Sequence, residues 1–192
     1  MVCSTGGLTI DQVDALYSFF NHNGVEFAFM HCVSIYPAPD ELLNLNQIDM
    51  FLKRYPGCYI GWSTHEEQDN TTAIQIAYAK GACLFERHIG ISDNKYELNK
   101  YSSTPDQLDK WMDAYNQARI MCGSYYRNTV NEIETEALNT LLRGVYAKKN
   151  LKKNAVLSRD LVYFAMPYEE GQLSSVDWNA NLKINADVSI DK

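Results

Sequence analysis

The sequence lacks several features that define whole classes of protein. No apolar run approaches the roughly 20 residues that a bilayer-spanning helix needs, and no basic segment followed by an apolar core stands near the start. The formal net charge is -7 and the sequence pI is near 5.0, so an extended basic face for nucleic acid or anionic membranes is not expected. These absences predict a cytoplasmic protein with no nucleic-acid partner and no membrane partner.

Cysteine pairs are also missing. The five cysteines are odd in number and widely separated, and no two of them form a CxxC motif; they are Cys3, Cys32, Cys58, Cys83 and Cys122. This spacing argues against a disulfide framework and against a structural zinc site. We expect reduced thiols that are mostly buried.

What is present is an alternation of short apolar runs and helix-patterned segments. The 192 residues are 46% hydrophobic and 21% charged, which is sufficient for a buried core. Strands are predicted near 2–3, 27–35, 58–62 and 82–88, and helices near 9–22, 46–54, 70–80 and 104–122. Four β-then-α units in a row predict parallel strands with right-handed crossovers. That is half the content of a TIM barrel, or else a small doubly wound sheet.

The C-terminal part has a different pattern. Residues 124–142 form a polar connection with some helical character, and we place a domain boundary there, after a first domain at 1–123. Residues 143–192 predict a small β-rich domain that opens with a strand, a lysine-rich turn, a short strand before Ser158 and another strand.

Two histidines stand at predicted strand ends. In a parallel α/β sheet the active site lies beyond the carboxyl ends of the strands, and His65 and His88 both occupy such ends. Residues two apart on a strand share a face, so His65 shares one with Ser63, and His88 with Glu86. Two imidazoles there suit a divalent transition metal with open positions. The alternative is that each is an ordinary structural histidine, as His31 is expected to be, because its parity turns it toward the helices.

Hydroxyl groups follow the other strand ends. Ser4-Thr5-Gly6, Ser34 with Tyr36, and Ser63 all stand at the edge where the histidines are expected. Serine or threonine hydroxyls beside glycine can hold an anionic group together with backbone N–H donors. Turn and helix-cap chemistry is the alternative explanation for each of them taken singly.

Five motifs, in order and spacing, resemble sialic acid synthases over nearly the whole chain. Matches to that family's strands five to eight are followed by a match to the opening of its antifreeze-like (SAF) domain. They are Ser4-Thr5-Gly6, His31 to Pro39, Gly61-Trp62-Ser63-Thr64-His65, Phe85-Glu86-Arg87-His88, and Arg143 to Tyr163. The resemblance implies that 1–123 is the C-terminal half, units five to eight, of a (β/α)8 TIM barrel. The segment 143–192 would then be an incomplete SAF-like domain.

The reaction implied by the resemblance joins phosphoenolpyruvate, an N-acylated amino sugar such as N-acetylmannosamine, and water into a nonulosonic acid, with release of phosphate. Such enzymes use a divalent metal, usually Mn²⁺. Carried over motif by motif, His65 and His88 would be the metal ligands and, with Glu86, the catalytic residues. The residues implied to bind substrate are Ser4, Ser34 and Ser63 for phosphoenolpyruvate and Tyr36 for the sugar.

The sequence also departs from that family. The first four barrel strands and their substrate residues have no counterpart here, Leu98 to Ser102 stands where a sugar-binding aspartate is expected, and no arginine stands near 164–167. We therefore expect the chain alone to make little product and to form a homodimer or pair with the missing barrel half. One alternative is a non-catalytic carbohydrate-binding or assembly module. Another is a different metal-dependent TIM-barrel lyase.

Overall fold

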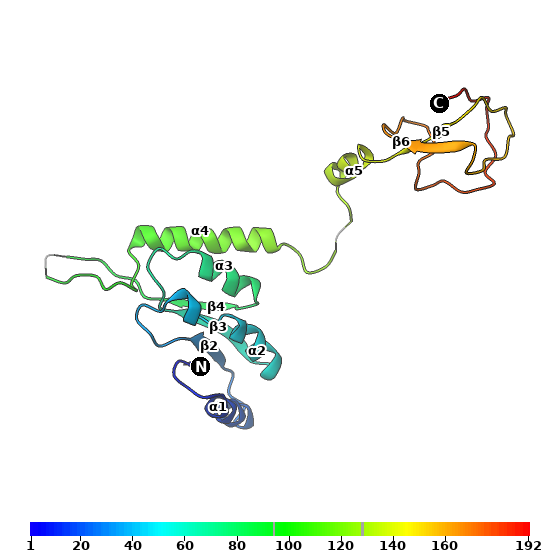
Figure 1. The fold of residues 1–192 in the computed structure, drawn as a ribbon. Helices are drawn as coiled ribbons and strands as arrows, with labels where there is room; N and C mark the ends of the chain where they lie inside the picture. The colour runs from blue at the N-terminus through cyan, green and yellow to red at the C-terminus, as the bar shows by residue number, and fades with distance from the viewer. Residues whose placement is uncertain (94, 128) are drawn as a thin grey trace. The chain divides into compact units, whose positions relative to one another are not determined.

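The structure, a computed structural model, describes residues 1–93, 95–127 and 129–192 and divides into two compact units, Met1–Tyr125 and Tyr126–Lys192 (Figure 1). The first unit alternates strands and helices along its whole length. Its strands are β1 (Val2–Ser4), β2 (Ala28–Cys32), β3 (Tyr59–Thr64) and β4 (Leu84–Arg87). Its helices are α1 (Ile10–His22), the 3-10 turn η1 (Asp40–Leu42), α2 (Asn46–Arg54), α3 (Thr72–Ala79) and α4 (Pro105–Cys122).

The four strands form one parallel sheet in the order β1-β2-β3-β4, which confirms the predicted α/β class. The strand order never reverses, and the single core of this unit joins strand residues to all four helices on one face of the sheet. The sheet is therefore singly wound, and the doubly wound alternative is wrong. Core side chains from each layer include Phe29, Ile60 and Trp62 from strands, and Val13, Phe51, Ile74 and Trp111 from helices.

Local sequence signals fix where the helices begin. The Thr9 side chain accepts from the backbone N–H of Gln12, whose side chain in turn accepts from the N–H of Thr9, so α1 has a complete capping box. The same reciprocal pair joins Thr104 and Gln107 at the start of α4, where Pro105 takes the first helical position. Both helix starts match their predictions, because each side chain satisfies a donor that the first turn leaves free.

The face of the sheet opposite the helices changes character along the strands. Near the strand starts it carries Val2, Tyr59 and Leu84, which remain 63%, 53% and 38% exposed. Near the strand ends the same face carries polar residues such as Ser63 and Glu86. The apolar part of this face has no covering layer within the described residues, and the polar part forms the edge on which the predicted site lies.

The cysteines are free thiols, but the expectation that most are buried is wrong. Only Cys32 is buried; Cys3 and Cys58 are intermediate, and Cys83 and Cys122 are exposed. Cys83 precedes β4 and Cys122 ends α4, so both lie at element ends that the core does not cover.

The second unit has its own small core. This unit contains α5 (Glu132–Asn139), which has no buried residue, and an antiparallel pair, β5 (Gly144–Ala147) and β6 (Val162–Ala165). The core lies around the strand pair and consists of Val145, Ala147, Leu151, Leu157 and Val162. The short strand predicted before Ser158 is absent, because Asn154 takes a positive φ of 71° and Val156 pairs only through one isolated bridge to Lys183. No helix in the described part of the chain is long and apolar enough to cross a bilayer.

Gly61 is required by the close approach of three strands. A Cβ at this position would lie 2.7 Å from the Leu84 carbonyl oxygen and would also collide with the Met30 sulfur. We expect Gly61→Ala to lower the free energy of unfolding by about 1–3 kcal/mol through overpacking. Urea unfolding measures this, with Tyr59→Phe on the same strand as a control that changes stability by less than about 0.5 kcal/mol. Equal stability of the two variants would contradict the packing described here.

Candidate functional site

The two predicted metal histidines lie together. His65 follows β3 and His88 follows β4, and because these strands are neighbours the centroids of the two rings are 5.2 Å apart. His65 is buried, with 6% of its surface exposed, whereas His88 is exposed. The pair therefore has one fixed ring and one ring that faces solvent.

Hydrogen bonding selects the tautomer of His65. Its Nδ1 lies 3.0 Å from the Val33 carbonyl oxygen, which can only accept, so Nδ1 carries the proton. The Cys32 sulfur is 3.7 Å from the same nitrogen. In the neutral ring the lone pair is then on Nε2, which is the arrangement that a metal-binding histidine needs.

The residues present thus fit a divalent metal that accepts imidazole ligands and keeps open positions. Within residues 1–93, 95–127 and 129–192, no three His, Cys, Asp or Glu side chains cluster closely enough to hold an ion by themselves. A metal here would take two protein ligands, His65 and His88, and would bind its remaining ligands from substrate or water.

Tyrosine rings border the histidine pair. The ring of Tyr36 lies 4.3 Å from that of His65, and the ring of Tyr101 lies 5.3 Å from His88 and 5.1 Å from Tyr36, measured between centroids. Tyr36 was expected near the sugar, and it does lie beside the histidines. Tyr101 was not predicted as a site residue; its only sequence signal is that it stands within the segment that departs from the sialic acid synthase motif.

The predicted serines and Glu86 lie along the same edge. Ser63 is buried, and it pairs in register with Cys32 on one side and Glu86 on the other. A Cβ at Gly6 would collide with the Ser34 hydroxyl, so the turn after β1 lies directly against Ser34. In that turn the backbone N–H of Gly6 donates to the Ser4 hydroxyl at 3.4 Å. The four strand ends therefore present hydroxyls and one carboxylate beside the histidines.

A buried ion pair lies behind the histidines and was not predicted. The Arg87 guanidinium donates to Glu66 Oε1 at 2.5 Å, and the two side chains are 2% and 0% exposed. Burial raises the pKa of the Glu66 carboxyl, and the charge of Arg87 opposes that rise. Each partner is the chain neighbour of one histidine, and that adjacency is the only signal of the pair in the sequence.

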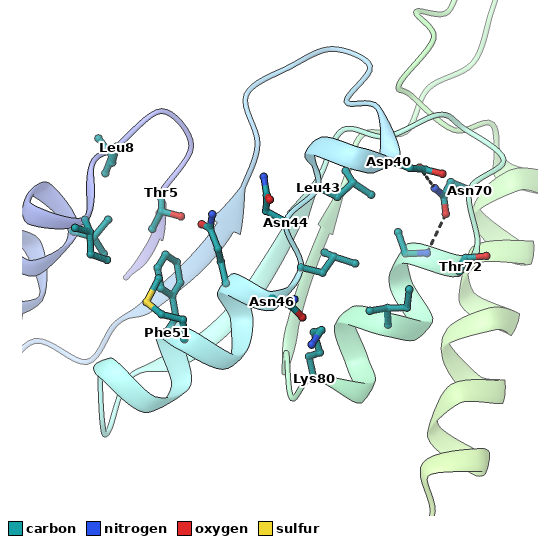
Figure 2. A pocket seen from close by; sticks show the side chains of 17 residues that line it. Thr5, Leu8, Asp40, Leu43, Asn44, Asn46, Phe51, Asn70, Thr72 and Lys80 are labelled. Atoms are coloured by element: carbon teal, nitrogen blue, oxygen red, sulfur yellow. Dashed lines mark hydrogen bonds between the residues drawn. The ribbon is translucent and has the colours of Figure 1, made fainter.

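A pocket of about 680 Å³ lies elsewhere, in the helix layer (Figure 2). Its walls come from the turn after β1, the segment before α2, and the helices α1, α2 and α3, and none of the predicted site residues lines it. Two polar pairs lie at its rim, where Asn70 donates to Asp40 at 2.8 Å and Lys80 donates to Asp49 at 2.7 Å. The chemistry-bearing edge of the sheet is thus distinct from this pocket.

Comparison with known proteins agrees with the motifs. The model of the NeuB family matches residues 1–127. The chain belongs to the NeuB family. Among its relatives is the human N-acetylneuraminate-9-phosphate synthase, 28% identical over 165 residues that cover 84% of this chain and 45% of the human protein. The resemblance to sialic acid synthases is thereby confirmed.

Two further relatives of this NeuB-family chain are spore coat polysaccharide biosynthesis proteins. SpsE of Bacillus subtilis is 30% identical over 187 residues, covering 90% of this chain and 50% of that protein. A crystal structure of protein E from Chromobacterium violaceum superimposes with a TM-score of 0.83 at 37% identity, over 99% of this chain and 58% of that one. The chain spans about half the length of the curated relatives it matches.

His31 is a core residue and not part of the site, as its parity predicted. It is 2% exposed, its Nε2 bonds to the Leu43 carbonyl at 2.8 Å, and burial lowers its pKa. The unfolded chain, with an ordinary histidine pKa near 6.5, therefore takes up more protons than the folded chain at mildly acidic pH.

We accordingly expect the free energy of unfolding to fall as the pH drops from 7 toward 5. His31→Gln should reduce this slope, because the titrating group is gone. Denaturant unfolding at a series of pH values measures it, with the exposed His22→Gln as the matched control. A slope that is the same in His31→Gln as in the unaltered chain would count against this role for His31.

Proposed function

We propose that this chain is part of a nonulosonic acid synthase that condenses phosphoenolpyruvate with an N-acylated amino sugar of the N-acetylmannosamine type and releases phosphate. The observation that carries the proposal is the pair His65 and His88, 5.2 Å apart on adjacent strand ends in a NeuB-family chain. The naming of a human relative as an N-acetylneuraminate-9-phosphate synthase supports the reaction class.

His65 Nε2 and the His88 ring would hold the metal, with Mn²⁺ the expected ion. When bound, such an ion supplies Lewis-acid chemistry by polarising the aldehyde oxygen of the sugar. The hydrogen bond from His65 Nδ1 to the Val33 carbonyl orients the ring and, in the neutral imidazole, leaves the lone pair on Nε2. In this proposal Tyr36, whose ring centroid lies 4.3 Å from that of His65, contacts the sugar from the side.

Phosphoenolpyruvate would bind along the serine edge. In this proposal the hydroxyls of Ser4, Ser34 and Ser63 donate to its phosphate and carboxylate. Local donors of this kind can hold a small anion even in a protein with a net negative charge. In the reaction, water adds to C2 while C3 bonds to the aldehyde carbon, and the aldehyde oxygen takes up a proton to become a hydroxyl. The bond between C2 and the phosphate oxygen then breaks, so that C2 becomes a ketone and phosphate leaves. In this proposal Glu86, which is exposed and pairs in register with Ser63, accepts a proton from the water.

The architecture proposed for the chain is units five to eight of a (β/α)8 barrel at 1–123, a linker at 124–142 and a partial SAF-like domain at 143–192. The sequential strand order and the helices on one face support it, because a barrel is a singly wound sheet closed on itself. The exposed apolar side chains of the other face, such as Val2 and Leu84, would point into the barrel interior.

The metal site is tested by measuring Mn²⁺ binding to the purified chain with isothermal titration calorimetry or electron paramagnetic resonance. We expect His65→Ala and His88→Ala each to weaken binding at least tenfold, since each removes one of two protein ligands. His22→Ala, an exposed histidine at the end of α1, should bind as the unaltered chain does. Unchanged affinity in both site variants would refute the metal assignment.

The half-barrel is tested by mass in solution and by turnover. We expect the chain to dimerise through its uncovered sheet face, and Val2→Asp with Leu84→Asp to shift it toward monomer in light scattering. Phe19→Asp, at an apolar residue on α1 that is 61% exposed, serves as the control. We also expect little product from phosphoenolpyruvate and N-acetylmannosamine. A monomeric chain with full turnover would contradict this architecture, and Mn²⁺ binding without turnover in any assembled form would favour a non-catalytic module.

A further inference from the structure

Arg87 occupies an unusual place between the two histidine strands. Arg87 is the last residue of β4, directly before His88, but its side chain lies on the face of the sheet opposite to that of His88. There its guanidinium lies 5.6 Å from the centroid of the Trp111 ring on α4. Its side chain is 2% exposed. Burying a charged guanidinium is costly unless its N–H groups are hydrogen-bonded. The hydrogen-bond partners of Arg87 therefore show which parts of the structure it connects.

Four of those partners lie at the end of β3 or just after it, and one of them is the Glu67 carbonyl, to which Arg87 Nη2 donates at 3.3 Å. Arg87 Nη1 donates to Thr64 Oγ1 at 3.3 Å and to Glu66 Oε1 at 2.5 Å, and Nη2 donates to the Gln68 carbonyl at 2.8 Å. These residues flank His65 on both sides. The guanidinium thus fixes the backbone around His65 relative to β4, which ends at Arg87, directly before His88.

A further partner belongs to the loop that returns after β4. Arg87 Nε donates to the Ser103 hydroxyl at 2.6 Å, and the N–H of Ser103 donates to the His88 carbonyl at 2.9 Å. Four residues earlier in this loop, the Gln68 side chain donates to the Asn99 carbonyl at 2.6 Å. Tyr101 stands between these two anchored positions, and its ring is edge-on to His88 at 5.3 Å.

Stability alone does not account for the buried ion pair. Replacing such a pair with apolar side chains of similar volume is often neutral or stabilising, since desolvation cancels most of the attraction. Glu66 Oε2 also has no hydrogen-bond partner among the described residues. What the pair supplies is a fixed geometry between two strand ends and one loop.

We propose that Arg87 is a positioning residue that sets the spacing of His65 and His88 and holds the Tyr101 ring against them. The proposal rests on the proposed function for the role of the histidines as metal ligands. Lysine would not serve equally, because one ammonium group cannot reach Glu66, Gln68 and Ser103 in three directions as a planar guanidinium does.

The first test needs no metal. Nuclear Overhauser effects between the ring protons of Tyr101 and His88 are measured in the full 192-residue chain with labelled tyrosine and histidine. We expect them in the unaltered chain, and we expect them to be lost in Arg87→Met, in Arg87→Lys and in the double variant Glu66→Leu/Arg87→Met. The matched control is Arg54→Met, which removes an arginine–carboxylate contact of the same 2.5 Å length to Asp14 at an exposed position.

The double variant guards against misfolding, because it leaves no buried charge unpaired. Circular dichroism establishes which variants fold. If the ring contacts are absent from the unaltered chain, or persist in folded Arg87 variants, the proposal is wrong. If every Arg87 variant unfolds, the residue is structural and the positioning role also fails.

The second test measures the metal site with Co²⁺, whose visible absorption reports ligand geometry. We expect Arg87→Lys and the double variant to bind Co²⁺ about five- to tenfold more weakly than Arg54→Met, with an altered spectrum. If the unaltered chain binds no Co²⁺ or Mn²⁺, the proposed metal function fails, and the ring contacts still decide the positioning role. Folded Arg87 variants that have lost the ring contacts could still bind Co²⁺ with the affinity and spectrum of the unaltered chain. That result would overturn the effect of Arg87 on the histidine spacing and would limit its role to placing Tyr101.

Discussion

The parallel register of β2, β3 and β4 is the constraint on which the rest of the structure depends. It pairs Cys32 with Ser63 and Ser63 with Glu86, so residues far apart in sequence meet at one edge. Since side chains alternate along a strand, the same register that buries Phe29, Ile60 and Trp62 against the helices turns the polar residues to the other face. Shifting any strand by one residue would turn its core side chains to the face of the site and its site side chains toward the core.

Much of this could be predicted because it follows from local patterns. Capping boxes set the starts of α1 and α4, and parity placed His65 and His88 on one face and His31 on the other. Those signals lie within a few residues of the features they determine. The order of the strands in the sheet could be learned only from the structure, because an alternation of strands and helices is compatible with both a singly and a doubly wound sheet.

Other parts of the site depend on contacts between distant segments, and sequence patterns do not carry them. Tyr101 reaches the histidines because its loop is anchored at Asn99 and Ser103 by side chains from two other elements. The exposure of Cys83 likewise depends on where the helix layer ends, and the missing strand before Ser158 depends on the backbone of Asn154. Each of these is decided by tertiary packing or by a single backbone angle.

The packing around the turn after β1 limits which substitutions this edge of the sheet can accept. Because the space beside Gly6 is taken by the Ser34 hydroxyl and the Cys32 sulfur, a side chain at position 6 would require these two side chains to move. If the strand-end hydroxyls bind an anion as proposed, new donors are introduced more readily at those hydroxyl positions than at position 6. Position 6 has little room for a side chain, and laboratory libraries aimed at new hydrogen-bond donors at this edge would gain by keeping glycine there.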